Sequence, residues 1–348
     1  MDNYRDILSF TFEELEKYIT DAGYPAFCSR QIYAWLHKKL AAKWDEMTNV
    51  PKKLREQLSG KYDILPLCIK EKLTSEIDGT SKYLMASYDG GIIESVAMRY
   101  SYGMSVCISS QIGCRMGCRF CASTLLGLER NLTASEMLSQ VYNIQRDTGE
   151  RVDNIVIMGI GEPFDNYDEV LKFIRMVTDA DGLNISQRNI TVSTCGLADR
   201  IYDFADEELA VTLAISLHAP DDSIRKTIMP VAGRYSIDDI MEACRYFIMK
   251  TGRRVTFEYT LIDGVNDSTE CAAELVSLLR GMLCHVNLIA LNSVRERDCR
   301  SSAMQNIKCF EKYLQKHRIN ATIRRGMGRD IDAACGQLRK RYLNSVDI

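Results

Sequence analysis

The sequence predicts an α/β fold whose core is a parallel sheet covered by helices. From about residue 105 onward, short apolar and β-branched runs recur, and longer segments with helical periodicity separate them. Six strand-then-helix units in a row are typical of a parallel sheet with crossover helices. Polar and glycine-rich residues also follow nearly every strand, and the carboxyl ends of parallel strands are where such folds carry their chemistry.

The first 66 residues predict an N-terminal helical accessory domain. Phe12, Leu15 and Ile19 recur at helical spacing, and Thr11 and Pro51 are helix start signals. Residues 67–104 change character and predict a β-hairpin linker, because two alternating stretches flank a turn of Asp and Gly at 89–91.

Residues 105–335 form the predicted α/β core, and residues 336–348 a C-terminal tail. Strands are expected at 106–108, 155–158, 190–192, 211–217, 255–261, 286–291 and 321–323. Helices are expected at 134–146, 167–177, 237–249, 270–279 and 303–314. Such units form either an open doubly wound sheet or a partial (β/α) barrel, and the pattern alone leaves both open.

Composition indicates an ordinary globular protein of a reducing compartment. The start of the chain is charged, no apolar run is long enough for a membrane span, and 13 cysteines in such a chain favour thiols and metal ligands. We therefore expect a cytoplasmic protein without a membrane partner. The net charge of −3 gives no indication of nucleic-acid binding. Residues 31–72, however, carry nine Lys or Arg against five Asp or Glu, which suits either phosphate contacts or solvated helix faces.

Three cysteines lie within eight residues after the first core strand. Cys114, Cys118 and Cys121 form a C-x3-C-x2-C triplet with no fourth cysteine at short spacing. Three thiolates can hold three corners of a 4Fe-4S cluster and leave one iron open to an outside ligand. The alternatives are zinc, whose cysteines usually come as two separated pairs, and cysteines without a metal. The spacing favours the iron–sulfur cluster.

Polar residues at the ends of the later strands are the next candidates. Gly161 and Glu162 follow the second core strand, where a glycine lets a ligand approach the backbone and a carboxylate accepts hydrogen bonds. The third glycine of a dinucleotide fingerprint is missing, which excludes that site. The other candidates are Ser193, Ser216, Leu217, His218 and Asn292. For each of them a turn or a satisfied structural residue is the alternative.

Three further residues are ambiguous on the sequence alone. Glu94 is either a buried base or a solvated carboxylate, and Cys335 is either a reactive thiol or core filler. Cys107, seven residues before Cys114, is a fourth cluster ligand, a redox-active thiol or core filler. The remaining cysteines are expected to pack in the core. They are Cys28, Cys68, Cys195, Cys244, Cys271, Cys284, Cys299 and Cys309.

The triplet and the six units together resemble the radical S-adenosylmethionine superfamily. The resemblance sharpens to the RlmN family of RNA adenine-C2 methyltransferases at several stretches. They are 107–114, 161–163, 213–220, 261–267, 285–289 and 330–338. The resemblance implies a partial (β/α)6 radical S-adenosylmethionine barrel. It also implies two cofactors, a 4Fe-4S cluster and S-adenosyl-L-methionine.

The resemblance also implies a role for each candidate residue. Cys114, Cys118 and Cys121 would ligate the cluster. Cys335 would carry a transient methyl group, Cys107 would form a disulfide with it, and Glu94 would be the proton acceptor. Contacts to S-adenosylmethionine would come from Gly161, Glu162, Ser193, Ser216, Leu217, His218 and Asn292.

The implied reaction methylates C2 of adenosine in 23S rRNA, in the peptidyl-transferase region, and in tRNA beside the anticodon. Two S-adenosylmethionine molecules would be used per turnover, with an external flavodoxin-like electron donor and a monomeric enzyme. A Cfr-type adenine-C8 methyltransferase shares the cysteines and is the nearest alternative. A non-catalytic RNA-binding protein with a metal–cysteine site is the more distant one.

Overall fold

The structure, a computed structural model, describes residues 6–292 and 296–333. Within these ranges the strands form one ten-stranded sheet in the order β1-β2-β3-β4-β7-β8-β9-β10-β11-β12, and a separate β5-β6 pair. The large sheet is open, because its two edge strands β1 and β12 are not hydrogen-bonded to each other. Its core strands are β4 Gly103–Ile108, β7 Val152–Ile157, β8 Ile190–Thr194, β9 Thr212–Ser216, β10 Val255–Leu261, β11 Cys284–Ala290 and β12 Ala321–Ile323.

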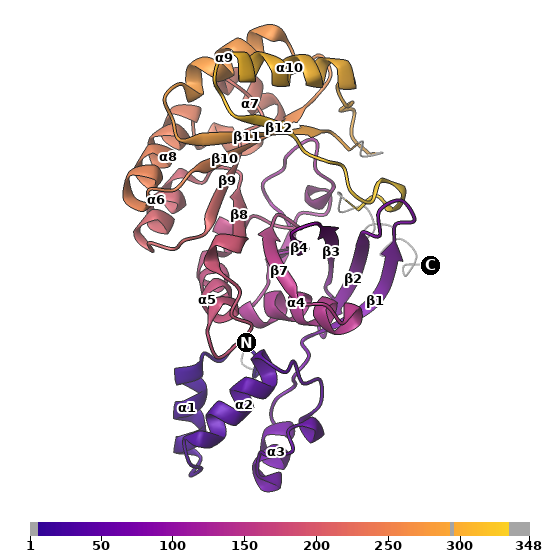
Figure 1. Cartoon of the computed structure of the whole chain (residues 1–348), viewed down its shortest axis with the longest axis vertical. Helices are drawn as coiled ribbons and strands as arrows, with labels where there is room; N and C mark the ends of the chain where they lie inside the picture. The colour runs from indigo at the N-terminus through magenta and orange to yellow at the C-terminus, as the bar shows by residue number, and fades with distance from the viewer. Residues whose placement is uncertain (1–5, 293–295, 334–348) are drawn as a thin grey trace.

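All pairings from β4 to β12 in this sheet are parallel, as the alternating pattern predicts. Helices cover the outer face of the curved sheet (Figure 1). They are α4 Ala134–Thr148, α5 Tyr167–Thr178, α6 Ala198–Asp206, α7 Asp222–Ile228, α8 Ile237–Thr251, α9 Thr269–Leu279 and α10 Met304–Lys316. The curved, open sheet with outer helices is the partial-barrel alternative of the two that the sequence leaves open.

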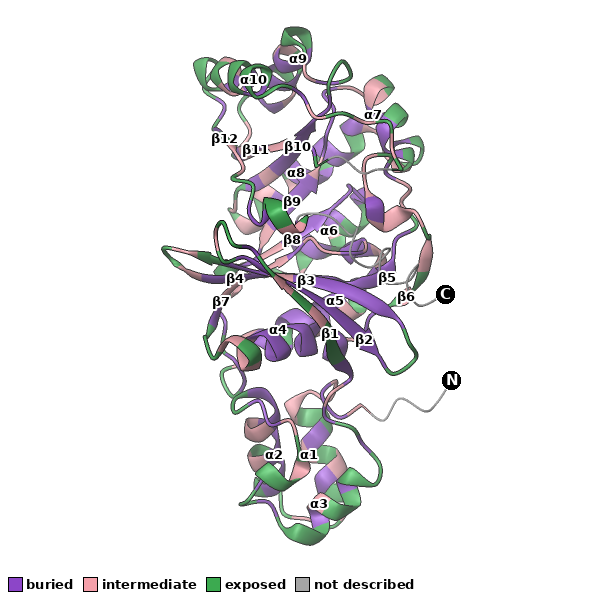
Figure 2. Cartoon of the chain, turned by 90° about the vertical axis from the view of Figure 1, so that its right-hand side faces the viewer, coloured by how far each residue is buried: buried purple, intermediate pink, exposed green. Residues whose placement is uncertain are grey.

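The contact between β10 and α10 shows which side chains of β10 point to the helices and which point to the inner face of the sheet. The ring of Tyr259 on β10 contacts Phe310 on α10, with centroids 5.3 Å apart, so Tyr259 and Phe257 point to the helices. Side chains alternate along a strand, so Glu258 between them points to the inner face. Figure 2 shows the result, a sheet that is largely buried beneath helices whose outer sides are exposed.

The N-terminal helices pack as the helical spacing predicts. They are α1 Phe12–Asp21, α2 Phe27–His37 and α3 Lys52–Ser59, and a single 3-10 turn, Trp44–Glu46, separates the last two. Thr11 caps α1 through a reciprocal pair of hydrogen bonds with Glu14. The buried side chains of these helices belong to the same hydrophobic cluster as the sheet. The helices lie beneath α4 and α5 at one end of the molecule (Figure 1).

The predicted hairpin is present as β2 Ser81–Ser87 and β3 Ile92–Tyr100. The structure adds an outer strand, β1 Leu67–Thr74, and joins β3 to β4 by antiparallel pairing. These strands therefore extend the main sheet instead of linking two separate bodies. The sequence analysis did not predict β1, because this edge strand is mostly exposed and carries charged residues where a core strand would be apolar.

The chain after β12 returns to the opposite edge of the sheet. Residues 326–333, which we call the strap, run from β12 back to the β1–β2 turn (Figure 1). Asp330 accepts hydrogen bonds from Ser75 Oγ at 2.6 Å and Glu76 N at 2.9 Å, and Gly328 N donates to Asp78 Oδ2 at 3.0 Å. The strap thus connects the two edges that the sheet itself does not join.

Two of the sequence predictions for cysteines are wrong. Cys68 and Cys309 are exposed, because Cys68 lies on the edge strand β1 and Cys309 lies on the solvent side of α10 between buried residues. All twelve cysteines of the described ranges are free thiols. Cys335 and the predicted tail 336–348 lie outside the described residues, so the predicted disulfide stays a prediction. Among the described helices, none is both long and apolar enough to cross a lipid bilayer.

A buried histidine joins the N-terminal helices to α4 and gives a pH prediction. His37 is fully buried, its Nδ1 lies 2.8 Å from the hydroxyl of Tyr142, and burial lowers its pKa to about 3. The unfolded chain binds a proton at this residue below about pH 6.5, whereas the folded chain does not. As far as His37 is concerned, the unfolding free energy is therefore at its full value above about pH 6.5 and decreases as the pH falls toward 3.

We expect His37→Gln to remove about 1.4 kcal/mol per pH unit from the pH dependence of the unfolding free energy between pH 5 and 6. Urea unfolding of both proteins at a series of pH values measures the difference, in which contributions of the other groups cancel. Parallel pH curves for the two proteins would contradict the assignment of this buried, neutral imidazole.

Candidate active site

The candidate site lies on the inner face of the sheet, where neighbouring strands align polar residues in one row. Ser216 of β9 is in register with Glu258 of β10, which is in register with Asn287 of β11. Ser193 Oγ on β8 lies 3.4 Å from Ser216 Oγ. Asn287 donates to both oxygens of Glu258 at 3.2 and 3.1 Å. The predicted Ser193 and Ser216 are thus together, and the sequence missed the buried Glu258 beside them.

The cysteine loop is held at its base by the small β5–β6 sheet, Gln111–Gly113 and Leu128–Asn131. Cys114 N donates to Gly127 O at 2.9 Å, and this close approach requires Gly113, since a Cβ there would lie 1.9 Å from Gly127 O. Arg119 N donates to Ile228 O at 2.9 Å and ties the loop to α7. The three predicted ligands therefore occupy one fixed loop.

Two of these thiols are buried and the third, Cys121, is partly exposed. Burial raises the pKa of Cys114 to about 12 and that of Cys118 still further, so metal binding must displace their protons. No three His, Cys, Asp or Glu side chains of the described ranges gather around one point as ligands of a single ion do. Cysteines of a four-iron cluster bind different iron atoms and need not meet at one point.

The turn after β7 sits against the start of the cysteine segment. Ser110 N and Gln111 N both donate to Ile160 O, at 2.9 and 3.1 Å. A Cβ on Gly161 would lie 2.7 to 2.8 Å from atoms of Ser110 and Gln111, and its φ of +113° is one that L side chains rarely adopt. Glycine at this position is therefore required by close backbone approach.

Glu162 is buried and uses both carboxylate oxygens on main-chain donors. Oε1 accepts from Phe164 N at 3.0 Å, and Oε2 accepts from Cys195 N at 2.7 Å. Burial raises its pKa, and the hydrogen bonds from Cys195 and neighbouring groups oppose that rise. The residue thus joins the ends of β7 and β8, and a carboxylate retains further lone pairs for a ligand.

His218 follows β9 in a left-handed conformation with φ +57°. Its Nδ1 accepts from Thr260 N at 2.9 Å, which assigns the proton to Nε2. Burial, and secondarily the charge of Arg225, lowers its pKa to about 3, so the ring is neutral at physiological pH. Its edge-on contact with Phe120, at 4.9 Å, connects it to the cysteine loop. The structure therefore offers a neutral N–H donor next to the triplet.

Arg225 of α7 is a further residue that the sequence analysis missed. It is fully buried, and its guanidinium donates to the main-chain carbonyls of Leu217, Tyr235 and Cys195. Its charge acts on the Cys118 thiol and lowers the pKa of that group against the larger effect of burial. A fixed cation therefore lies behind the cysteine loop, where thiolates bound to iron carry negative charge.

A second cluster lies on the inner face of β2–β4. Tyr83 on β2 and Ser95 on β3 bond to Asp147 and Gln140 of α4, so their neighbours Lys82 and Glu94 point away from that helix. Lys82 Nζ lies 2.8 Å from Glu94 Oε2, and both residues are buried. Cys107 shares this face, because Lys82 pairs with Val96 and Val96 pairs with Cys107. Burial raises the pKa of Cys107, and Arg324 opposes that rise.

The predicted site residues are thus distributed as follows. Leu217 is buried at the end of β9, and Asn292 is exposed after β11. Cys335 lies outside the described residues. The sequence analysis missed Lys82. The signal was available, because pairing the two strands outward from the predicted turn at 89–91 makes Lys82 and Glu94 diagonal neighbours.

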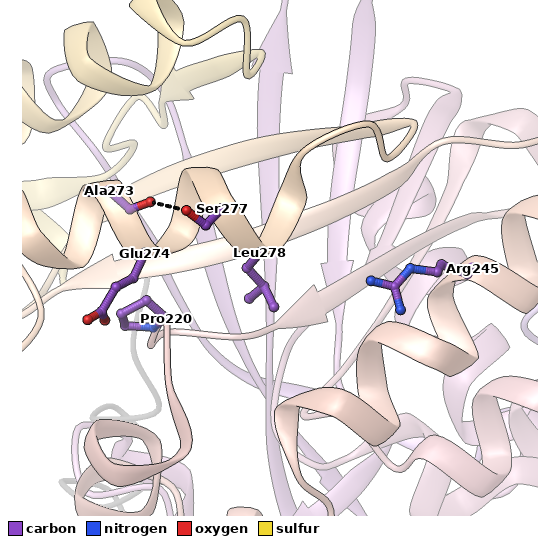
Figure 3. Close-up of a pocket in the computed structure, with 6 residues that line it drawn as sticks. All are labelled: Pro220, Arg245, Ala273, Glu274, Ser277 and Leu278. Atoms are coloured by element: carbon purple, nitrogen blue, oxygen red, sulfur yellow. Dashed lines mark hydrogen bonds between the residues drawn. The ribbon is translucent and has the colours of Figure 1, made fainter.

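The described residues line two hollows at the surface. One of about 480 Å³ lies between α8 and α9, lined by Arg245, Glu274 and Leu278 among others (Figure 3). No predicted site residue lines it. The second, of about 390 Å³, is lined by Arg119 of the cysteine loop and by residues 262–265 and 296–300. Only the second adjoins the candidate site.

The residues present fit a cluster and S-adenosylmethionine. Three cysteines on one loop and a row of hydroxyl, carboxyl and imidazole groups supply thiolate ligands and hydrogen-bonding partners. A profile of the Radical SAM superfamily matches residues 108–276. Fold and site together define a radical S-adenosylmethionine enzyme, and membership of this superfamily implies a 4Fe-4S cluster and S-adenosylmethionine.

A second profile, the ribosomal RNA large subunit methyltransferase N-terminal domain, matches residues 5–64. The "Probable dual-specificity RNA methyltransferase RlmN" of Lachnoclostridium phytofermentans is 57% identical over 341 residues, which cover 98% of this chain and 96% of that protein. Its counterpart from Clostridium perfringens is 53% identical, with 98% of each chain covered. The chain therefore belongs to the RlmN family and is a radical S-adenosylmethionine RNA methyltransferase.

Solved structures agree with this assignment. A radical SAM methyltransferase from Sphaerobacter thermophilus has a TM-score of 0.92 and 44% identity, with 95% of this chain and 98% of that chain covered. SuiB of Streptococcus suis, bound to S-adenosylmethionine, shares the fold at a TM-score of 0.50 and 15% identity, with 64% and 51% covered. The sequence resemblance to the RlmN family is thereby confirmed, and the non-catalytic alternative is wrong.

The close approach at Gly161 gives a prediction for the site. We expect Gly161→Ala to lower the unfolding free energy by about 3 kcal/mol and to weaken S-adenosylmethionine binding, because the added methyl meets buried atoms in a strained backbone. Gly149→Ala is the matched control: its φ is +69° but no atom lies within 4 Å, so a loss of only about 1 kcal/mol is expected. Urea unfolding and equilibrium dialysis measure both effects, and equal losses in the two variants would contradict the steric argument.

Proposed function

We propose that this enzyme methylates C2 of adenosine in 23S rRNA, in the peptidyl-transferase region, and in tRNA at the adenosine 3′ of the anticodon. The relatives are named as dual-specificity RNA methyltransferases, which supports two RNA substrates. Adenine C2 lies between two ring nitrogens and is electron-poor, so it cannot attack a sulfonium methyl as a nucleophile. Radical chemistry is the suitable route to such a carbon.

The cluster would be held by Cys114, Cys118 and Cys121. S-adenosylmethionine would contact Gly161, Glu162, Ser193, Ser216, Leu217, His218 and Asn292. When bound, the two groups supply the one-electron chemistry that makes a carbon radical. The chain fixes their surroundings: Glu162 and His218 are oriented by main-chain hydrogen bonds before any ligand arrives.

Three residues would handle the methyl group and the proton. The Cys335 thiolate accepts a methyl from one S-adenosylmethionine, and a second molecule is consumed when that methyl carbon is joined to the adenine. One hydrogen of that methyl leaves with 5′-deoxyadenosine, and after the carbon joins C2 the adduct gives up one electron and the C2 proton. The Cys107 thiolate then attacks the Cys335 sulfur, so a disulfide forms, and the carbon keeps the electron pair of the broken bond and takes up a proton to become the methyl group. A thiol reductant returns the two cysteines to their reduced state. Glu94 accepts the C2 proton. An external flavodoxin-like electron donor and a monomeric, cytoplasmic enzyme complete the proposal.

The observation that supports this assignment is that Glu94 and Cys107 share one face of the sheet and that the strap is bonded on that face. Lys82 Nζ, bonded to Glu94, also donates to the carbonyl of Asp332 at 2.9 Å. Asp332 is three residues before Cys335 in the sequence. The chain that leads into the proposed methyl carrier therefore reaches the side of the sheet that bears the other two groups.

The proposed product is tested by mass analysis of nucleosides from RNA treated with the anaerobically reconstituted enzyme. We expect 2-methyladenosine; 8-methyladenosine would overturn the proposal in favour of the Cfr-type reaction.

Cys335→Ala should retain the cluster and yield no methylated nucleoside, because it lacks the methyl carrier. Cys107→Ala should retain the cluster and accumulate a covalent protein–RNA adduct, because nothing resolves the bond to Cys335. Full methylation by either variant would refute its assigned role.

Basic residues of the N-terminal helices are proposed to contact RNA phosphates. Lys38, Lys39, Lys52 and Lys53 are exposed, and Lys39 lies over the ring of Trp35 at 3.8 Å. The N-terminal helices lie at the end of the molecule opposite α10 (Figure 1). This placement provides a surface for RNA that extends away from the inner face of the sheet.

We expect charge reversal at these four lysines to weaken RNA binding and to reduce the slope of log affinity against log salt, since each phosphate contact adds about 0.7 to 0.9 to that slope. Charge reversal at four exposed residues in and just after α10, namely Lys308, Lys312, Lys316 and Arg318, is the matched control and should leave the slope unchanged. Filter binding at several salt concentrations measures both. Equal effects of the two sets would show that net charge, and not this surface, determines affinity.

A further inference from the structure

Lys82 is a buried lysine to which the proposed reaction assigns no role. Its side chain is completely inaccessible, and it lies on β2, a strand whose every residue is buried. Its ammonium lies 2.8 Å from Glu94 Oε2 and 2.9 Å from the carbonyl oxygen of Asp332. One group therefore connects a side chain of the sheet with the main chain of the strap.

Stability alone does not explain an ammonium at this position. Removing two charges from water is costly, and well-packed apolar residues of similar volume are often as stabilising as a buried ion pair. The gain from such a pair lies in orientation: a lysine has donors for more than one acceptor, and each bond restricts where its partner lies. Here the two partners are the Glu94 carboxylate and the segment that leads into Cys335.

The strap has other anchors, and they lie in the β1–β2 turn. Asp330 bonds to Ser75 and Glu76, and Gly328 bonds to Asp78. Among the bonds that join the strap to the sheet and its turns in the described ranges, the one made by Lys82 comes from a side chain with no exposed surface and lies nearest to Cys335 in sequence. It is therefore the contact best suited to set the depth at which the strap enters the site.

We propose that Lys82 is a positioning residue, whose one ammonium orients the Glu94 carboxylate and docks the strap, the segment that precedes Cys335 in the sequence. This inference rests on the proposed roles of Glu94 and Cys335. It adds that the proton acceptor and the segment leading to the methyl carrier are held by one shared group. Loss of that group releases both at once.

The experiment compares Lys82→Met, Lys82→Arg and the wild type, with Lys72→Met as the matched control. Lys72 lies on the adjacent strand β1 and bonds to Asp147 on the opposite face, at 2.6 Å. We expect Lys82→Met to lower single-turnover RNA methylation about 100-fold, as a displacement of about 1 Å at a reacting group does. Amide hydrogen exchange of residues 328–333 should accelerate in that variant and not in Lys72→Met.

Lys82→Arg keeps the charge and donors, so it should recover at least about tenfold of the lost rate and part of the strap protection. Wild-type methylation by Lys82→Met would overturn the inference. Loss of methylation with unchanged exchange of the strap would also overturn it, because Lys82 would then act on Glu94 alone. Absence of 2-methyladenosine from the wild-type reaction would instead refute the proposed function, so the two failures are distinguishable.

Lys82→Met could unfold the protein by leaving Glu94 buried without its cation. A second comparison covers that outcome: Lys82→Met with Glu94→Gln has no buried charge at either position, and Glu94→Gln alone retains the lysine. If Lys82 docks the strap, amide hydrogen exchange of residues 328–333 should be faster in the double variant than in Glu94→Gln alone. Equal exchange in the two proteins would refute docking by Lys82.

Discussion

The parallel register of β4 and β7–β12 is the constraint on which the rest of the structure depends. It aligns Ser216, Glu258 and Asn287 in one row on the inner face, while Phe257 and Tyr259 of the same strand pack against the helices. A shift of β10 by one residue would turn Glu258 into the helical core and Phe257 into the site. The apolar packing that stabilises the outer face therefore also determines which polar groups meet on the inner one.

Main-chain hydrogen bonds fix the polar groups of this face. Glu162 accepts from two backbone amides, His218 accepts from one, and Arg225 donates to three carbonyls. Each of these bonds joins the end of one strand to a neighbouring segment. Buried polar groups satisfied in this way are expensive to move, so the site is oriented before ligands bind. The strand ends are thus both the frame of the fold and the walls of the site.

Much of the fold follows from local pattern, because core strands are apolar runs and their helices have clear periodicity. The exceptions have physical reasons: β1 is a partly exposed edge strand, and α6 and α7, neither of which the sequence analysis predicted, have only nine and seven residues. Most of the site could be predicted from the rule that polar residues at strand ends converge, together with the family resemblance. Arg225 could not be, since its partners are carbonyls that only the folded chain brings near. For Lys82, the register of the predicted hairpin indicates the neighbouring Glu94, but not the bond to the carbonyl of Asp332.

The strap lies between the two edges of the open sheet that do not pair with each other. The edges β1 and β12 cannot pair with each other, so the side of the barrel between them stays uncovered by strands. Residues 326–333 approach that side through hydrogen bonds to a turn and one bond from the buried Lys82, without joining the sheet. Segments held by few bonds open at a lower free energy than paired strands do. In the proposed reaction Cys335 meets S-adenosylmethionine and RNA in turn, and attachment to such a segment suits a residue that must face two partners.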